Sequence, residues 1–246
     1  MVKRLFLIND SSSRYNELIK ACFLNESFKE IKLSNETEEK EIVKNINAFP
    51  FDKVFAFFSP IPLFNLCRYL KKERVFDFRL IVLDESNSLE IKKLRNYSFA
   101  YIDCSNIDCK ELNEKVDACI KENELIVSFS SFGYKYEIPA DADLIFDCRN
   151  IPNPYWEKGL KEKTGLDEEV ISFLESKESV KEFSSYLFNY LDYFLKEASK
   201  EERKFLSIYF GCTGGQHRSV FFATQAYMRY KSKYRCLISH KELKRQ

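Results

Sequence analysis

The residues most able to do chemistry lie in one segment, residues 211–219, which reads Gly-Cys-Thr-Gly-Gly-Gln-His-Arg-Ser. This segment holds three of the six glycines in the chain and one of its two histidines. An apolar run over residues 204–210 precedes it, and a helical pattern over residues 220–228 follows it, so we expect a strand, a turn and a helix. Such a turn offers backbone N–H groups and the positive end of a helix dipole to an anion. We therefore predict a phosphate site on Thr213, Gly214, Gly215, His217, Arg218 and Ser219, in which Arg218 acts as a bidentate donor.

The same segment also has the Cys-x5-Arg spacing of the cysteine phosphatases, from Cys212 to Arg218. In those enzymes a thiolate with a lowered pKa attacks phosphorus. They usually carry a histidine before the cysteine, where this chain has Gly211, and they need an aspartate as general acid, for which no residue stands out. A hydrolase that uses Cys212 is thus the alternative to a binding protein, in which Cys212 is a small buried residue at the strand end.

Further polar side chains follow other strand patterns. Lys135 comes after a strand-like run over residues 125–132, and Arg149 and Tyr155 come after another over residues 143–147. In open α/β sheets, ligands bind outside the carboxyl ends of the strands, so these residues and the 211–219 turn are expected to share one pocket. The alternative is that Arg149 pairs with a nearby aspartate and that Tyr155 is a packing group.

The end of the chain is basic, although the formal net charge of the whole chain is only +1. A solvated tail is one interpretation, and contact with RNA phosphates is the other. We predict RNA contacts from Arg229, Lys231, Lys233, Arg235, His240, Lys241, Lys244 and Arg245.

Composition narrows the class of protein. The eight cysteines form no C-x-x-C pair, so we expect reduced thiols in a cytoplasmic protein. The two histidines are far apart and the thiols are not clustered, so we expect no metal site and no cofactor. No apolar run approaches the ~20 residues of a membrane helix, and the N-terminus is typical of a first strand rather than of a signal sequence.

Strand and helix patterns alternate along the chain, which predicts an α/β fold with mainly parallel sheets. We place strands near residues 4–8, 53–58, 79–83 and 100–102 in the first half, with helices near 15–23, 63–70, 88–96 and 108–123. In the second half, strands near 125–132, 143–147, 204–210 and 234–238 enclose helices near 166–175, 180–199 and 220–228. We expect two closely packed units, residues 1–123 and residues 124–246.

The first unit lacks the residues of a nucleotide loop. All six glycines lie at or after Gly133. A Walker-type loop needs glycines and a Lys-Ser/Thr pair after the first strand, where this chain has Asn-Asp-Ser-Ser-Ser-Arg over residues 9–14. This segment indicates a turn and a helix N-cap. Nucleotide binding with residual NTPase activity in the first half is kept as a second alternative.

The second half resembles the C-terminal domain of the RapZ (YvcJ-like) family of bacterial P-loop proteins. The resemblance covers about residues 124–246 and rests on motifs that occur in the same order: Ser131-Phe-Gly-Tyr-Lys-Tyr136, Phe146-Asp-Cys-Arg-Asn-Ile-Pro-Asn-Pro-Tyr-Trp156, Thr164-Gly-Leu-Asp167 and the 211–219 turn. The first half is similar to the family's kinase-like domain in its β-α rhythm and in Tyr101-Ile-Asp-Cys-Ser-Asn106, and it would be a degenerate version without the Walker motif.

The resemblance implies a regulatory binding protein rather than an enzyme. It implies a C-terminal site for a phosphorylated amino sugar, glucosamine-6-phosphate, and RNA binding by the same domain. For some members of the family, the resemblance implies a role as an RNase adaptor, with an endoribonuclease as partner. A homo-oligomer is compatible with the resemblance. The family's phosphate turn carries over onto Thr213, Gly214, His217 and Arg218, whereas Tyr155 stands where some members have a ligand-contacting histidine.

Overall fold

The computed structural model describes residues 4–9, 30–32, 39–48, 53–58, 60–73, 77–84, 88–105, 107–121, 124–201 and 204–243. The chain forms two compact units, Met1–Lys121 and Glu122–Gln246. Among the described residues each unit holds one sheet, and all the recorded strand pairings in both sheets are parallel. The predicted α/β fold with parallel sheets is confirmed.

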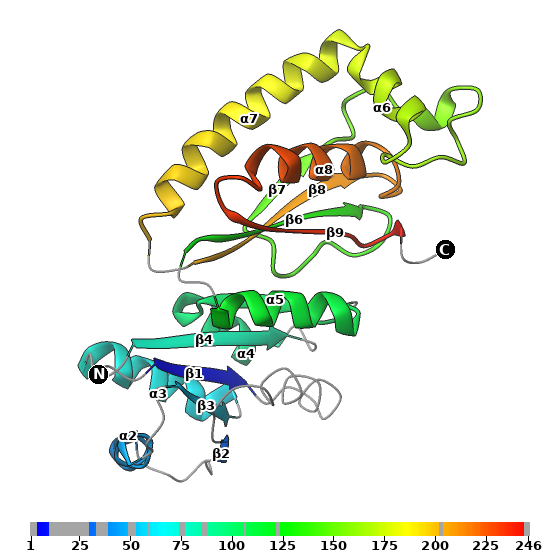
Figure 1. The fold of residues 1–246 in the computed structure, drawn as a ribbon. Coiled ribbons are helices and arrows are strands. Elements are labelled where there is room, and N and C mark those ends of the chain that lie inside the picture. Colours follow the sequence, from blue (N-terminus) through cyan, green and yellow to red (C-terminus); the bar gives the residue numbers. More distant parts are fainter. Residues whose placement is uncertain are drawn as a thin grey trace. The chain divides into compact units, whose positions relative to one another are not determined.

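The first unit is a five-stranded sheet in the order β2-β3-β1-β4-β5 (Figure 1). Its strands are β1 (Arg4–Asn9), β2 (Glu30–Lys32), β3 (Lys53–Phe58), β4 (Asp77–Asp84) and β5 (Ala100–Asp103). Its helices are α2 (Glu39–Asn47), α3 (Pro60–Glu73), α4 (Leu89–Leu94) and α5 (Cys109–Lys121), and a 3-10 turn (Arg95–Tyr97) follows α4. Strand β2 and helix α2 were not predicted, and the expected helix near residues 15–23 lies outside the described residues.

The core of the first unit joins one face of the sheet to helices α2, α3 and α4. Its buried members include Leu7, Leu80 and Val82 from the strands and Leu66 and Leu94 from the helices. On α5 the carbonyl of Cys119 accepts a hydrogen bond from Nη1 of Arg79, at 2.5 Å. The buried Arg79 guanidinium also stacks over the Phe99 ring, 4.5 Å from its centroid, so a charge inside this unit is held by a carbonyl and an aromatic face.

The second unit is a four-stranded sheet in the order β7-β8-β6-β9 (Figure 1). Its strands are β6 (Ile126–Gly133), β7 (Leu144–Asp147), β8 (Phe205–Cys212) and β9 (Arg235–His240). Its helices are α6 (Glu168–Glu175), α7 (Glu178–Ala198) and α8 (Arg218–Tyr230), with a 3-10 turn at Pro154–Trp156. The strand and helix patterns predicted for this half are confirmed within a few residues at each end.

Alternate residues of the central strands pack against these helices. Leu206, Ile208 and Phe210 of β8 join Val127 and Phe129 of β6 in one buried cluster with the inner sides of α6, α7 and α8. Figure 1 shows α7 and α8 on the same side of this sheet. Because α8 starts directly after the turn that follows β8, packing of α8 on the sheet sets the position of the turn.

Candidate functional site

The carboxyl ends of all four strands of the second sheet meet at one edge. Asp147 at the end of β7 is in register with Gly211, Gly133 at the end of β6 is in register with Cys212, and His240 at the end of β9 is in register with Ser131. The segments that follow these strands therefore gather there. They carry Lys135, Arg149, Lys241 and the 213–217 turn, so the residues predicted to share a pocket do leave the sheet at the same edge.

The 213–217 turn lies directly on the segment that follows β6. Backbone N–H groups of Tyr134 and Lys135 donate to the carbonyls of Cys212, at 2.9 Å, and Thr213, at 3.1 Å. Gly215 has a φ of +73°, and a Cβ atom there would lie 2.3 Å from Cγ of Glu242. A glycine is required at this position both by the left-handed backbone and by the close approach of Glu242.

The outer part of the turn is open. Thr213 is exposed, and a Cβ atom at Gly214 would meet no atom within 4 Å. Helix α8 begins just beyond, with Arg218 as its first residue. An anion placed at Thr213 and Gly214 would face unobstructed backbone close to the positive end of a 13-residue helix.

Two exposed cations, Lys135 and Arg149, flank this opening. Nζ of Lys135 lies 4.8 Å from the centroid of the Tyr136 ring. Arg149 forms a bidentate ion pair with Asp147, in which its Nη2 lies 2.6 Å from Oδ2, and its guanidinium stacks 3.9 Å from the centroid of the Tyr134 ring. Hydrogen bonds from Arg149 hold the pKa of Asp147 below its usual range. The structure thus shows the alternative in which Arg149 pairs with a nearby aspartate.

Arg218 points inward, away from the open side of the turn. It is 4% exposed, and its Nη1 donates to the carbonyls of Arg149, at 2.9 Å, and Ile151, at 3.1 Å. Its Nε is buried and has no hydrogen-bond partner among the residues that the structure describes. In this arrangement Arg218 anchors the segment after β7, and direct bidentate contact with a phosphate stays a prediction.

His217 and Ser219 also face inward. Nε2 of His217 lies 3.1 Å from the carbonyl oxygen of Leu160, and the side chain is 7% exposed. Oγ of Ser219 lies 3.1 Å from Sγ of Cys212 and is fully buried. These two side chains brace the turn from beneath, so an anion on the outer surface would meet Thr213 and Gly214 before it met either of them.

Burial lowers the pKa of His217 below its ordinary value, and the nearby charge of Arg218 lowers it further, whereas hydrogen bonds to the backbone of Leu160, Lys161 and Lys163 oppose this shift. The folded protein therefore holds a neutral imidazole under conditions in which the unfolded chain, with a pKa of about 6.5, begins to bind a proton. Because the unfolded state binds more protons, stability falls as pH decreases below ~6.5 toward the folded-state pKa.

We expect the free energy of unfolding to fall between pH 7.5 and pH 5.5 in the wild type, and to fall less steeply in His217→Gln. Urea unfolding at several pH values measures this slope. His240→Gln removes the other histidine of the chain and is the control. Its free energy of unfolding should depend on pH as that of the wild type does, because His217 is still present. An identical slope in wild type and His217→Gln would contradict a neutral, buried His217.

The sulfur of Cys212 lies under the turn. Its Sγ accepts a hydrogen bond from the N–H of Gly215, at 3.3 Å, and the residue is 3% exposed. A phosphatase nucleophile must reach a phosphorus atom that is held over the loop. Burial at the strand end is the placement expected for Cys212 in the binding interpretation, and the choice between binding and phosphatase chemistry stays a prediction.

A second glycine contact, which the sequence reasoning missed, fixes the base of the site. A Cβ atom at Gly165 would lie 2.2 Å from the carbonyl oxygen of His217 and 2.6 Å from the backbone nitrogen of Phe221. The N–H of Gly165 donates to the carbonyl of Gln216, at 2.8 Å. Gly165 lies in the Thr-Gly-Leu-Asp motif, which the sequence analysis used only as part of the family resemblance. The glycine in that motif was the one feature of the sequence that could have indicated this close contact.

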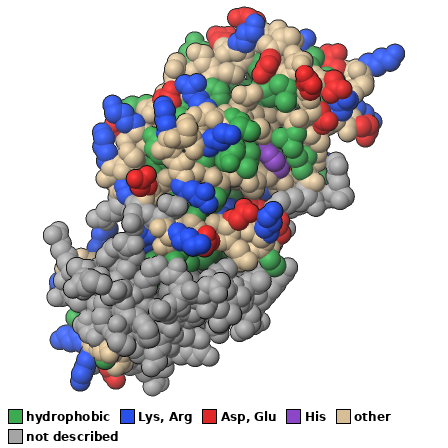
Figure 2. Space-filling view, viewed as in Figure 1, with side chains coloured by type: hydrophobic (Ala, Val, Ile, Leu, Met, Phe, Trp, Pro, Cys, Tyr) green, Lys and Arg blue, Asp and Glu red, His purple; other side chains and the backbone are tan. Residues whose placement is uncertain are grey.

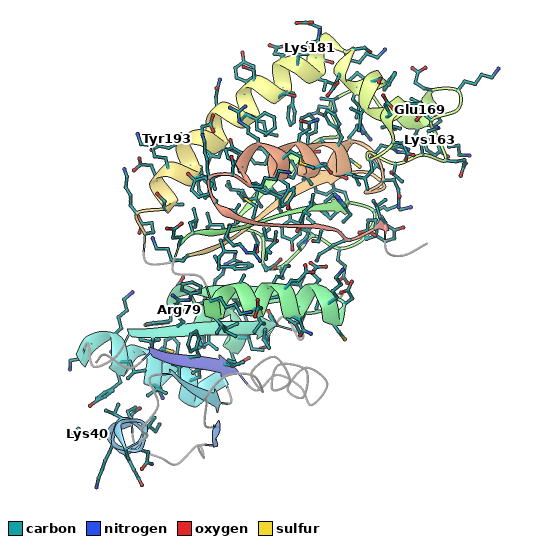
Figure 3. All side chains as sticks on the ribbon, in the orientation of Figure 1. Lys40, Arg79, Lys163, Glu169, Lys181 and Tyr193 are labelled. Atoms are coloured by element: carbon teal, nitrogen blue, oxygen red, sulfur yellow. The ribbon has the colours of Figure 1, made fainter. Side chains whose placement is uncertain are left out.

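The segment between β7 and α6 carries an exposed aromatic pair. Tyr155 is 41% exposed and Trp156 is 79% exposed, with their ring centroids 5.0 Å apart. Nζ of Lys161 lies 5.2 Å from the centroid of the Tyr155 ring. Further along, Lys163 forms an ion pair with Glu169 of α6 (Figure 3). Tyr155 is thus accessible to a ligand, and its contact with one stays a prediction.

The basic run near the end of the chain is divided by strand β9. Arg235 begins the strand in register with Ile126, whereas His240 ends it in register with Ser131. Five steps along the strand separate the two positions by about 17 Å. The residues at or before Arg235 thus lie at the amino-terminal edge of the sheet, opposite the 213–217 turn, while His240 and Lys241 lie at the edge that carries it. Lys244 and Arg245 lie outside the described residues.

Individual members of the run also differ in their partners. Arg229 pairs with Asp192 of α7 at 2.9 Å, and Nδ1 of His240 lies 2.9 Å from Oγ of Ser131. Lys231 and Lys233 are exposed. In the face that Figure 2 displays, basic side chains are interspersed with acidic ones. The six predicted RNA contacts that the structure describes are thus divided between two edges of the sheet, and contact of any of them with RNA stays a prediction.

Among the described residues, no group of three or more His, Cys, Asp or Glu side chains could hold a metal ion. In the same described part of the chain, no helix has the length and apolarity needed to cross a membrane.

Fold and site together define an α/β protein with a glycine-rich turn at the carboxyl edge of a parallel sheet. Residues 125–244 match the family model of the RapZ C-terminal domain. A nucleotide-binding protein of Shewanella loihica is 36% identical over 222 residues, which cover 85% of this chain and 78% of that protein. A nucleotide-binding protein of Thermosipho africanus is 40% identical over 171 residues, which cover 68% of this chain and 61% of that relative. The chain belongs to the RapZ family.

Two designed proteins of the P-loop NTPase fold, determined by solution NMR, align with TM-scores of 0.39 and 0.38 at 18% and 16% sequence identity. The alignments cover 48% and 51% of this chain and 90% and 95% of the designed proteins.

Proposed function

We propose that this chain is a regulatory binding protein of the RapZ type, which holds a phosphorylated amino sugar such as glucosamine-6-phosphate at the 213–217 turn and binds RNA with its C-terminal unit. One observation carries the proposal: Thr213 and Gly214 present open backbone ahead of α8, at the edge where four parallel strands end. Family membership supports the ligand class, because the resemblance in residues 124–246 implies a sugar phosphate and RNA.

The phosphate would be held by the outer backbone of the turn, with positive charge from Lys135 and Arg149. Arg218 acts in this proposal as a positioning residue, because its guanidinium holds the carbonyls of Arg149 and Ile151. The sugar would extend toward the exposed Tyr155 and Trp156, whose rings offer apolar faces to a pyranose.

The ligand is tested by calorimetry with glucosamine-6-phosphate on the wild type and on Thr213→Glu. We expect Thr213→Glu to raise the dissociation constant at least about tenfold, because its carboxylate would face the phosphate. Thr213→Gln has nearly the same shape without the charge, and it should bind within about threefold of the wild type. Equal affinities of Thr213→Glu and wild type would place the ligand elsewhere.

Further titrations separate the possible carriers of the phosphate. Glucosamine without phosphate should not bind, and inorganic phosphate should bind more weakly than the sugar phosphate. The relatives are named nucleotide-binding proteins, so ATP and GTP are titrated as well. Binding of a nucleotide that Thr213→Glu does not weaken would favour a nucleotide site in the first unit, where residues 10–29 lie outside the described part.

The RNA partner is tested on the same variants by gel shift at several salt concentrations. Replacement of Lys231 and Lys233 by alanine should make the negative slope of log affinity against log salt shallower, by about 0.7 for each lost contact with a single strand. Release of RNA by glucosamine-6-phosphate would indicate that RNA also occupies the 213–217 turn. An adaptor role further requires that the RNA-bound chain recruit an endoribonuclease.

A further inference from the structure

Two buried cysteines lie opposite each other where the neighbouring strands β7 and β8 end (Figure 1). Asp147 at the end of β7 is in register with Gly211 of β8, so Cys148 and Cys212 occupy the next step of the same ladder. The N–H of Cys148 donates to the carbonyl of Gly211, at 2.7 Å, which continues the parallel pairing to this step. The spacing of paired strands therefore places the two Cα atoms about 4.8 Å apart.

Both cysteines have free thiols and belong to the buried cluster on the helix-covered face of the sheet. Sγ of Cys148 lies 3.7 Å from the carbonyl oxygen of Phe146, and Sγ of Cys212 lies 3.1 Å from Oγ of Ser219. A disulfide requires Cα atoms about 4.4 to 6.8 Å apart. The backbone thus already has the spacing of a disulfide, and rotation of each sulfur about its Cα–Cβ bond would bring the pair together.

The two thiols differ in their surroundings, which assigns the order in which they react. Cys148 is fully buried, whereas Cys212 is 3% exposed and is the first to meet an oxidant. Burial raises the pKa of the Cys148 thiol, and the nearby Cys212 raises it further, although the charge of Arg218 opposes this shift. Sγ of Cys212 accepts a hydrogen bond from the N–H of Gly215, at 3.3 Å, just before α8 begins. An N–H donor and a helix N-terminus both stabilise a thiolate, so Cys212 is the attacking sulfur.

We propose that Cys148 and Cys212 are a site of oxidation by hydrogen peroxide, at which the two thiols join in a disulfide that alters the 213–217 turn. The Cys212 thiolate attacks one oxygen of the peroxide, the O–O bond breaks, and a sulfenic acid forms while the other oxygen leaves as water with the thiol proton. The thiol of Cys148 then attacks the sulfenic sulfur, and the hydroxyl leaves with its proton as a second water. The two sulfurs together lose two electrons, which reduce the peroxide.

The disulfide would act on the turn through the sulfur of Cys212. When this sulfur turns toward Cys148, the N–H of Gly215 loses its acceptor, and a buried N–H without a partner is costly. Gly215 is confined by its φ of +73° and by the side chain of Glu242, so the turn must shift to satisfy this N–H. Formation of the disulfide does not depend on the proposed function, whereas its effect on the sugar phosphate rests on it.

Mass spectrometry of the full chain tests the disulfide. The folded protein is treated with hydrogen peroxide, the remaining thiols are alkylated, and the digest is searched for the peptide that carries Cys148 joined to the peptide that carries Cys212. We expect this pair, with a mass lower by two hydrogen atoms than the reduced peptides together, and we expect dithiothreitol to separate it. Cys236→Ser removes another thiol of the same buried cluster and should form the pair as readily as the wild type.

Two variants test the order of reaction. Cys148→Ser should leave Cys212 as a sulfenic acid, which dimedone traps, because the second thiol is missing. Cys212→Ser should leave Cys148 unmodified, because the attacking sulfur is missing. Dimedone on Cys148 in the Cys212→Ser variant, as strong as on Cys212 in the other variant, would contradict the assigned order.

Hydrogen exchange measures the effect on the turn without any ligand. Peptides that cover residues 213–217 should exchange at least about tenfold faster in the oxidised wild type than in the reduced one, and dithiothreitol should reverse the change. Calorimetry on the same two samples should show a dissociation constant for glucosamine-6-phosphate at least about tenfold higher after oxidation.

Two results would overturn the proposal. One is a wild type in which Cys148 and Cys212 are not joined after peroxide treatment, or in which they are joined only to other cysteines. The other is equal hydrogen exchange at residues 213–217 in the reduced and oxidised forms. A chain that forms the disulfide and exchanges faster at the turn, but binds no sugar phosphate in either form, would contradict the proposed function and support the oxidation site.

Discussion

Gly165→Ala is expected to lower the free energy of unfolding by about 3 kcal/mol or more, and to abolish binding at the 213–217 turn. The added methyl group would lie 2.2 Å from the carbonyl oxygen of His217 and 2.6 Å from the backbone nitrogen of Phe221. These two atoms form the first hydrogen bond of α8, at 2.9 Å. Neither atom can rotate away as a side chain could, so the start of α8 must move.

Gly214→Ala is the matched control for this substitution. It adds the same methyl group to the outer face of the 213–217 turn, where no atom lies within 4 Å of the new Cβ. We expect its free energy of unfolding to stay within about 0.5 kcal/mol of the wild-type value. Urea unfolding of both variants measures the difference. If Gly165→Ala were as stable as Gly214→Ala, the close packing of Gly165 on α8 would be wrong.

Arg218→Ala is expected to lower the free energy of unfolding by about 3 kcal/mol and to weaken glucosamine-6-phosphate binding through disorder of the segment after β7. The substitution removes the donor that holds the carbonyls of Arg149 and Ile151. It also removes a positive charge that acts on the buried thiol of Cys148, whose pKa is raised by burial. Urea unfolding and calorimetry give the two effects separately.

Arg149→Ala is the comparison for Arg218→Ala, because it removes an exposed arginine instead of a buried one at the same edge of the sheet. Arg149 is exposed and pairs with Asp147 near the surface, so its loss should cost less than about 1 kcal/mol. It should still weaken phosphate binding, because it removes a positive charge beside the opening. If Arg218→Ala weakened the ligand strongly without loss of stability, Arg218 would contact the phosphate directly, and its positioning role would be wrong.

Much of the fold could be predicted from residue patterns alone. The strand at Lys53–Phe58 was predicted with the observed bounds, because a continuous apolar run between polar residues indicates a buried strand. Strand β2 was missed, since Glu30, Ile31 and Lys32 form only three residues with charges on both sides. Helix α2 was missed too, because its sequence, Glu-Lys-Glu-Ile-Val-Lys-Asn-Ile-Asn, has few apolar positions from which to infer a buried side.

The location of the candidate site was also accessible from sequence, because it follows from order along the chain. A glycine-rich turn between a strand and a helix must lie at the carboxyl edge of a parallel sheet, and so must the segments that carry Lys135 and Arg149. The register of β6, β7 and β8 then places these segments beside one another. Local sequence pattern and parallel strand pairing together determine the location of the candidate site.

The roles of individual side chains were decided by tertiary structure. His217, Arg218 and Ser219 were predicted from the 211–219 segment as phosphate ligands, yet all three are buried and bonded to segments that are remote in sequence or to Cys212. The direction of a side chain at the start of a helix depends on which carbonyls lie beneath it. Those carbonyls, at residues 149, 151 and 160, come from a segment whose path no local pattern specifies.

The sequence by itself determined the α/β class, the strand–turn–helix at residues 211–219 and the absence of a Walker motif, because each depends on neighbouring residues. Only the tertiary structure decided that β9 separates the basic residues into two groups, that Gly165 supports α8, and that Cys148 lies opposite Cys212. These features depend on contacts between distant segments, and such contacts form only when the sheet and its helices have packed together.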